Sequence, residues 1–371
     1  MNRIVRFLSR SKMLPAPDTS RGLQAAAEWL ARAQDASGCD GVSAYYDVTK
    51  RQWVGAYPET TGYIIPTFFR YAEFSGNNEY RERALRMAAW ESDIQLPDGG
   101  VRAGTMDATQ IVPTIFNTGQ VLFGWLAAWR QTKERRFHDS AVRAADWLVA
   151  AQDSDGAWRR FASPFAVHTV NAYNTRVAFA LAEAGQMLGE PRYLDAAVRN
   201  VQWAMSQMHA NGWLDNNDLE DNERPLTHTI AYAARGFLEV GVIAKHGELV
   251  EVAMRIARAA AQSQRSDGAL PGRLDSAWRA ASRWSCVTGN AQMAIIWLRL
   301  AAETGDSIWK PAAERAIRFN LSIQDVEATN VGIRGGMSGS HPLSGGYMKN
   351  RYPNWAAKFF MDALMLKLGA G

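Results

Sequence analysis

Histidine, tyrosine, amide and arginine side chains gather in one short segment of this sequence. His168, Asn171, Tyr173, Asn174 and Arg176 fall within nine residues. Histidine or tyrosine can remove or return a proton, while arginine and amide groups can neutralise a carboxylate beside the reacting carbon. The segment therefore predicts proton abstraction at C5 of a uronosyl unit, which gives elimination or epimerisation.

A second histidine extends this set of proton-transfer groups. His228 lies in a later segment that also contains Tyr232. We expect His168, Tyr173 or His228 to exchange the proton, with Asn174 and Arg176 holding the substrate carboxylate. A lone histidine at a helix start can equally be a structural polar group, so variants must separate the two roles.

Hydrolysis of a glycosidic bond is the alternative chemistry, and it needs two carboxylates on either side of the scissile bond. Glu59 and Asp107 are the best candidates because each stands just before a predicted apolar helix. Glu59 could instead pair with an arginine, and Asp107 could cap a loop. Asp47, Asp218 and Asp275 are weaker alternatives on predicted loops.

Neither a metal nor a cofactor is expected. The two cysteines, Cys39 and Cys286, are too few for a four-cysteine zinc site or a disulfide framework, and they fit a reducing, cytoplasmic compartment. The glycines between residues 332 and 346 match neither a phosphate-binding loop nor a dinucleotide fingerprint. The net charge of +4 comes with no nucleic-acid-binding signature, so nucleic acid is not an expected partner.

The amino terminus and the apolar stretches indicate a soluble protein. Arg3, Arg6 and Arg10 interrupt the first apolar residues, unlike a secretory signal. The apolar run 121–129 is much shorter than the roughly 20 residues that span a bilayer. Residues 1–14 form a basic tail that could make a weak peripheral contact with anionic lipid.

A repeat organises the rest of the chain. Glutamine followed by a glycine-containing turn recurs at intervals of 61, 57, 55, 57 and 60 residues. The six glutamines are Gln34, Gln95, Gln152, Gln207, Gln264 and Gln324. An amphipathic helical pattern precedes each glutamine, and glycine suits the left-handed end of such a helix.

A second, more apolar helix is predicted between successive glutamines. Threonines near its start, such as Thr61, Thr118, Thr175, Thr229 and Thr288, are expected to cap it. These helices are predicted near 61–74, 114–130, 172–187, 229–244, 288–303 and 355–368. With six amphipathic partners outside them, they predict one all-α domain, an (α/α)6 barrel over residues 15–371.

In such a barrel, the loops that enter the inner helices meet at the mouth of a central cavity, which is the only concave site that the sequence predicts. Amides, arginines and aromatic faces suit a sugar, although each could serve only as a cap or in packing. The candidate binding residues are Tyr63, Asn117, Gln120, Asn171, Asn174, Arg176, Tyr232, Arg235, Trp284, Asn290, Gln292, Tyr347, Arg351, Asn354, Trp355 and Lys358. Together they predict an oligo- or polysaccharide substrate.

The turn sequence QDSDGAW at residues 152–158 resembles the Q-x-x-x-G-x-W turns of six-hairpin glycosidase-like barrels and of the toroids of terpenoid cyclases and protein prenyltransferases. The segments 332–340, 345–347 and 352–360 look like uncharacterised proteins of bacterial surface-polysaccharide gene clusters. This resemblance implies the barrel fold and a sugar context, and it supplies no catalytic residue. A non-catalytic glycan-binding or assembly protein and an isoprenoid-processing toroid remain alternatives, although the acidic motifs of terpene cyclases are missing.

Overall fold

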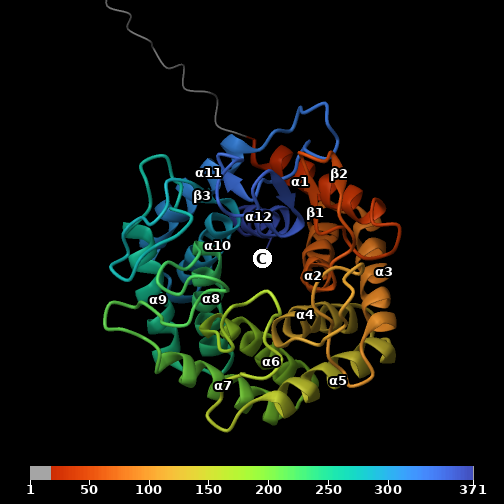
Figure 1. Cartoon of the computed structure of the whole chain (residues 1–371), viewed down its shortest axis with the longest axis vertical. Helices are drawn as coiled ribbons and strands as arrows, with labels where there is room; N and C mark the ends of the chain where they lie inside the picture. The colour runs from red at the N-terminus through yellow and green to blue at the C-terminus, as the bar shows by residue number, and fades with distance from the viewer. Residues whose placement is uncertain (1–17, 371) are drawn as a thin grey trace, which may run out of the picture.

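Twelve α-helices form two concentric rings in the computed structural model, which describes residues 18–370 (Figure 1). The inner helices are α2 Pro58–Ser75, α4 Ile115–Thr132, α6 Thr175–Leu188, α8 Thr227–Ile243, α10 Val287–Thr304 and α12 Asn354–Lys367. The outer helices are α1 Thr19–Asp35, α3 Asn78–Ile94, α5 Arg135–Ala151, α7 Pro191–Met205, α9 Gly247–Gln262 and α11 Lys310–Ile323. This arrangement confirms the predicted (α/α)6 barrel.

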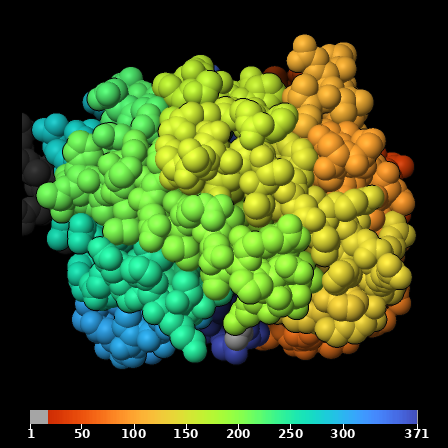
Figure 2. Space-filling view, turned by 90° about the horizontal axis from the view of Figure 1, so that it is seen from below, coloured from red at the N-terminus to blue at the C-terminus, as the bar shows by residue number. Residues whose placement is uncertain are grey.

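Burial follows the expected difference between the two rings. In the inner helix α4, every residue from Asn117 to Ala128 is buried. In the outer helix α5, buried residues recur every three or four positions, as at Phe137, Ala141 and Ala144. An inner helix packs against neighbours on all sides, whereas an outer helix has one face in solvent. Figure 2 shows the ring from the side, with successive hairpins running from orange through yellow and green to blue.

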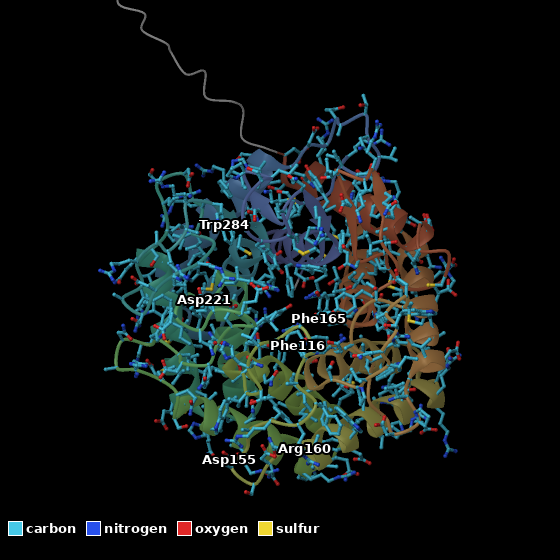
Figure 3. All side chains as sticks on the ribbon, viewed as in Figure 1. Phe116, Asp155, Arg160, Phe165, Asp221 and Trp284 are labelled. Carbon is cyan, nitrogen blue, oxygen red and sulfur yellow. The ribbon has the colours of Figure 1, made fainter. Side chains whose placement is uncertain are left out.

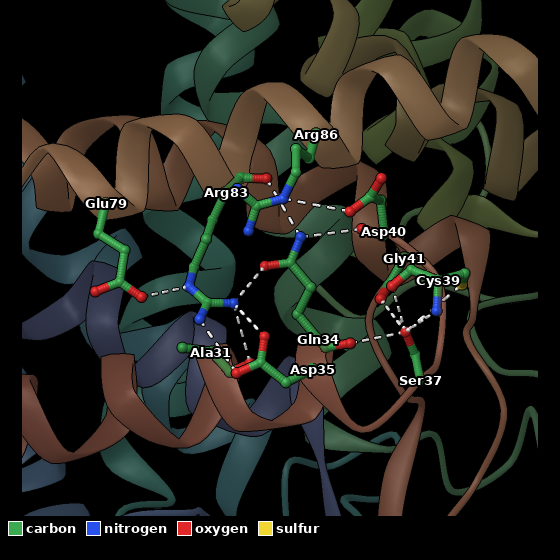
Figure 4. Close-up of polar contacts among 10 residues, drawn as sticks. All are labelled: Ala31, Gln34, Asp35, Ser37, Cys39, Asp40, Gly41, Glu79, Arg83 and Arg86. Atoms are coloured by element: carbon green, nitrogen blue, oxygen red, sulfur yellow. Dashed lines mark hydrogen bonds and ion pairs between the residues drawn. The ribbon is translucent and has the colours of Figure 1, made fainter.

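The repeated glutamines join neighbouring outer helices. The Gln152 amide nitrogen donates to the carbonyl of Gly156 in its own turn and to that of Ala196 in α7, at 3.1 and 2.9 Å. Gln95 and Gln264 make the same pair of bonds. The Gln34 amide nitrogen donates to the backbone carbonyl of Arg83 in α3 at 3.3 Å (Figure 4). The repeat thus encodes contacts between hairpins.

Gln207 departs from this pattern, since its amide nitrogen donates to the neighbouring Ser206 hydroxyl. Gln324 follows it and closes the ring, because its amide nitrogen donates to Gly22 in α1 at 3.0 Å and to Gly335 at 2.8 Å. Gly335 has φ +83°, and a Cβ atom there would lie 2.3 Å from the Ala25 carbonyl oxygen. Only glycine fits this closing turn without strain.

Short strands and two 3-10 helices complete the described structure. Strands β1 Tyr45–Asp47, β2 Gln52–Trp53 and β5 Arg351–Pro353 form an antiparallel sheet in the order β2-β1-β5, which joins segments from both ends of the chain. Strands β3 Ser285–Cys286 and β4 Ser340–His341 form a second pair. The 3-10 helices are η1 Ala172–Asn174 and η2 Ser307–Trp309.

The prediction that threonine side chains cap the inner helices was wrong. Thr61 and Thr118 lie inside the first turn of their helices, and each hydroxyl donates to the carbonyl four residues earlier. Each hydroxyl also accepts a backbone N–H from the preceding loop, at Val42 and Val101, both at 2.9 Å. These threonines therefore fasten the loops onto the helix starts.

The two ends of the ring differ in loop length. Connections from an outer to the next inner helix are long, as in 36–57, 95–114 and 324–353. Connections from an inner to the next outer helix are short, as in 76–77, 133–134 and 189–190. Long loops therefore cover the amino ends of the inner helices and leave the carboxyl ends less covered.

The sequence raised two questions about membranes, a spanning helix and a lipid contact of the basic tail, and the structure describes only the first. Within residues 18–370, no helix is both long enough and apolar enough to cross a bilayer. The basic tail at 1–14, with its proposed lipid contact, lies outside the described residues.

Candidate active site

Glu59 lies in the first turn of α2 at the amino ends of the inner helices. The Tyr57 hydroxyl donates to its carboxylate at 2.5 Å, and no arginine or lysine pairs with it among residues 18–370, contrary to the alternative reading of a rim ion pair. Burial raises the pKa of Glu59 to about 7, although the Tyr57 hydrogen bond lowers it. Burial is the larger cause, and the charge of Glu59 the next, of the raised pKa values of Tyr173 and Tyr232. Glu59 therefore lies close to tyrosines from two other inner segments.

His228 is the second proton-transfer group at this mouth. Its Nδ1 lies 2.8 Å from the Gln292 side-chain oxygen, which can only accept, so Nδ1 carries the proton. Burial lowers the pKa of His228 to about 4, so the ring is neutral at pH 7. The Nε2 lone pair is then available as a base. The His228 ring lies 4.5 Å from the Tyr232 ring and 5.6 Å from the Tyr347 ring, measured between centroids.

Aromatic rings surround these two groups. Phe116 lies 5.3 Å from Tyr173 and 5.0 Å from Tyr232, between ring centroids. The Trp355 indole nitrogen donates to the Tyr347 hydroxyl at 2.9 Å. Figure 3 places Phe116 near the centre of the ring, together with the exposed Phe165 of the loop between α5 and η1. Such faces can pack against the apolar side of a pyranose.

The segment 168–176 contributes unequally to the mouth. Tyr173 and Asn174 are buried at the end of η1. The Asn171 amide nitrogen donates to the Asp218 carbonyl at 3.0 Å. The His168 side chain lies in the loop before them, and its buried Nε2 has no hydrogen-bond partner within 18–370.

Some predicted amides serve the fold. The Asn117 amide nitrogen donates to the Arg102 carbonyl at 2.8 Å. The Asn290 amide nitrogen donates to the Ala316 carbonyl of α11 at 3.1 Å. Asn354 donates to the Ser43 carbonyl at 3.0 Å. These bonds fit the reading of helix-start amides as structural groups, and we leave Asn290 and Asn354 out of the proposed site.

Trp284 and Arg351 also lie in structural contacts. Trp284 packs against Gly272, where an added Cβ atom would overlap its ring, and Figure 3 shows it away from the centre of the ring. The Arg351 guanidinium lies 4.6 Å from the Tyr45 ring centroid and 3.7 Å from the Asp47 carboxylate. Arg351 thereby links β5 to β1.

The alternative carboxylates do not form a buried pair with Glu59. Asp107 is exposed, and its carboxylate packs against Gly55. The Asp218 carboxylate is fully buried and bonded to Arg273 at 2.9 Å and to the Thr229 hydroxyl at 3.1 Å. Asp218 is therefore already used in holding the loop before α8.

A cavity of about 1130 Å³ lies inside the ring, and it differs from the predicted mouth. It extends along the inner helices to Lys310 and Gly369, at their carboxyl ends. Six of the predicted binding residues line it, namely Tyr63, Arg176, Tyr232, Arg235, Gln292 and Lys358. The predicted central cavity is therefore present, but its lining continues past the amino-end mouth to the carboxyl ends of the inner helices, where the connecting loops are short.

Two carboxylates that the prediction missed organise this cavity. Asp362 lies 2.7 Å from both the Arg70 guanidinium and the Lys358 ammonium group. Glu239 lies 2.7 Å from Arg235 and is also bonded by Arg299, at 2.9 Å. The spacing of four residues within apolar helices, as in Lys358 and Asp362, is a signal from which such pairs could have been found.

Comparison with known proteins identifies the fold. No protein-family model and no curated protein sequence matches the chain. Among solved structures, unsaturated glucuronyl hydrolase from Bacillus sp. GL1 is similar over 94% of this chain and 96% of its own, with TM-score 0.75 and 18% identity. Cellobiose 2-epimerase from Bacillus thermoamylovorans covers 93% and 97%, with TM-score 0.70 and 10% identity. An α-mannanase from Bacteroides thetaiotaomicron covers 95% and 96%, with TM-score 0.67 and 17% identity. The chain thus has the six-hairpin glycosidase-like (α/α)6 fold.

Proposed function

We propose that this protein is a carbohydrate-active enzyme that moves a proton at C5 of a uronosyl unit in an oligo- or polysaccharide. The mouth combines aromatic faces with hydroxyl groups and two proton-transfer groups. Solved structures of the same fold include hydrolases of unsaturated glucuronyl units, one of them specific for heparin, and a cellobiose epimerase. These proteins support a sugar substrate, and the proposed reaction rests on the residues of this chain.

The observation that carries the proposal is the position of Glu59 and His228 beside the same tyrosine. Tyr232 lies against the His228 ring, and the charge of Glu59 acts on its hydroxyl. A neutral imidazole and a carboxyl group with a pKa of about 7, both close to Tyr232, provide a base and an acid at the same pH.

In the proposed reaction, His228 acts as the base and Glu59 acts as the acid. His228 Nε2 takes the C5 proton, and the electron pair of the C–H bond passes into the adjacent carboxyl group as an enolate. In epimerisation, protonated Glu59 returns a proton to the opposite face of C5. In elimination, the electron pair forms the C4–C5 double bond, the C4–O bond breaks, and the leaving oxygen receives the Glu59 proton.

Hydrolysis is the second candidate, because several solved structures of this fold are hydrolases. It would use Glu59 with Asp107, and two carboxylates about 5 to 10 Å apart would have to flank the bond. Asp107 is exposed, while Glu59 is half-buried and close to Tyr57, Tyr173 and Tyr232, so proton transfer at C5 is favoured. Two alternatives remain, a protein that binds glycans without changing them and an enzyme that processes isoprenoids. Neither would produce a modified sugar in the test below.

The test incubates the protein with uronic-acid polysaccharides in deuterated water. Deuterium at C5 without cleavage would establish an epimerase, and unsaturated uronosyl products would establish a lyase. New reducing ends without unsaturation would establish a hydrolase and refute proton transfer at C5. Retention on a glycan array with no product of any kind would favour a binding protein.

Variants assign the roles. We expect His228→Ala and Glu59→Gln each to lower the rate at least about 100-fold, since a positioned acid or base contributes 10² or more. His168→Ala and Tyr173→Phe test whether the loop segment takes part. Asp107→Asn is the control, because only the hydrolase mechanism requires it. Melting temperatures near that of the wild type must accompany these losses.

A further inference from the structure

Arg176 is a buried cation in the central cavity, and no carboxylate of residues 18–370 forms an ion pair with it. Its side chain is 6% exposed, and its only hydrogen bond within residues 18–370 runs from Nε to the Gln120 side-chain oxygen, at 3.3 Å. The two terminal guanidinium nitrogens are left without protein acceptors. A buried ionic group normally has an opposite charge or several hydrogen bonds, because removing it from water is costly.

Aromatic rings fix the position of this guanidinium. Its carbon lies 4.4 Å from the Phe123 ring centroid and 5.3 Å from that of Phe179. The Gln120 amide nitrogen beside it is also buried without a hydrogen-bond partner. Phe123, Phe179 and Arg176 all line the cavity. The terminal nitrogens of the guanidinium are thus held at the cavity without an acceptor among residues 18–370.

The surrounding charges do not supply that acceptor. Asp362 is shared between Arg70 and Lys358, and Glu239 is shared between Arg235 and Arg299. Arg176 is therefore a cation of the cavity with which neither of these two carboxylates forms an ion pair. Glu183 also lines the cavity, and its charge acts on Arg176, but no ion pair or hydrogen bond joins the two side chains within residues 18–370. Burial and the charge of Glu239 raise the pKa of Glu183, while Arg176 lowers it.

We propose that the cavity is a second binding site, for the carboxylate or phosphate group of a small organic anion, which Arg176 receives as a fork of two N–H donors. Arginine binds such planar or tetrahedral oxyanions through paired hydrogen bonds. The volume of about 1130 Å³ exceeds the need of a bare ion and accommodates a molecule of saccharide size. This site goes beyond the proposed function, since Glu59 and His228 do not line it, although Tyr232 and Gln292 border both the mouth and the cavity.

The test measures binding of sodium phosphate, sodium glucuronate and neutral glucose by isothermal titration calorimetry. We expect phosphate or glucuronate to bind and glucose not to bind, with the better of the two identifying the oxyanion. Arg176→Gln should weaken binding at least 10-fold, whereas Arg176→Lys, which keeps the charge but loses the fork, should weaken it less. Arg136→Gln is the matched control, because Arg136 also packs near a phenylalanine, Phe137, but on the outer helix α5.

Stability gives an independent readout. In anion-free buffer, Arg176→Gln should unfold at a temperature equal to or above that of the wild type, because it removes an uncompensated charge. The anion that binds should raise the melting temperature of the wild type and leave that of Arg176→Gln unchanged. No binding to the wild type, or equal binding to Arg176→Gln, would overturn the proposal. Glu59→Gln and His228→Ala should keep anion binding. Failure of the proposed reaction at the mouth and failure of the anion site in the cavity can therefore be distinguished.

Discussion

The half-buried carboxyl group of Glu59 should make the stability of the protein depend on pH in a way that one substitution removes. Its pKa rises from 4.5 to about 7 on folding, mainly through burial. Because one pKa unit corresponds to 1.36 kcal/mol, keeping this carboxylate charged in the folded protein costs about 3 kcal/mol. Below pH 4.5, the group is protonated in both states and costs nothing.

The direction in which the free energy of unfolding changes with pH follows from proton binding by Glu59. Between pH 4.5 and about 7, the folded state holds more protons on Glu59 than the unfolded state, so the free energy of unfolding falls as pH rises. Glu59→Gln has no such group. Relative to the wild type, this variant should gain about 2 to 3 kcal/mol of stability between pH 5 and pH 8. Groups such as His228, which titrate in both proteins, cancel in the comparison.

The assay is urea unfolding of wild type and Glu59→Gln at pH 5, 6, 7 and 8. Tyr57→Phe is the companion variant, because the Tyr57 hydrogen bond lowers the Glu59 pKa and its removal should move the transition above pH 7. A stability difference between wild type and Glu59→Gln that stays constant across this range would refute the buried, proton-binding carboxyl group. It would also remove the proposed acid from the mechanism.

Two further predictions concern the closure of the ring, and both are measured by urea unfolding. Gln324→Ala removes two hydrogen bonds and should lower the free energy of unfolding by about 1 to 3 kcal/mol, whereas Gln207→Ala should cost less, since Gln207 does not join two outer helices. Equal losses would contradict the role of the glutamines. Gly335→Ala should cost more than Gly76→Ala, because both have positive φ but only the first would place Cβ against a backbone oxygen. The Gly76 substitution should cost about 1 to 2 kcal/mol, and an equal effect at Gly335 would show that the turn can move.

Most of the fold could be predicted because the repeat has a local cause and a local signal. Each glutamine stands at a helix end, and each Asp-Gly or Asn-Gly pair needs positive φ, so the pattern is legible in sequence. The polarity of the two helix types also separated the inner from the outer ring. What the repeat could not show was that Gln152 bonds to Ala196 in the next hairpin, since the partner is a backbone carbonyl with no sequence signature.

The site was less predictable, because residues close in sequence point to different places. Tyr173, Asn174 and Arg176 were expected to act together at the mouth. The turn from η1 into α6 leaves Tyr173 beside Phe116, while the Arg176 guanidinium reaches Phe123 and the cavity. Tyr57 was missed although it precedes Glu59 by two residues, since nothing in the sequence shows that its hydroxyl turns back onto that carboxylate.

The direction of the inner helices explains why the two proposed sites differ in charge. All six amino ends point to the mouth, where the partial positive charge of a helix start favours an acidic sugar. Their carboxyl ends point to the other opening, where cations are favoured, and Arg130 and Lys367 occupy the last turns of α4 and α12 there. An anion would therefore be bound poorly at that opening itself. Arg176, in the first turn of α6, lies far enough from those carboxyl ends to bind one, which places the proposed anion site deep in the barrel.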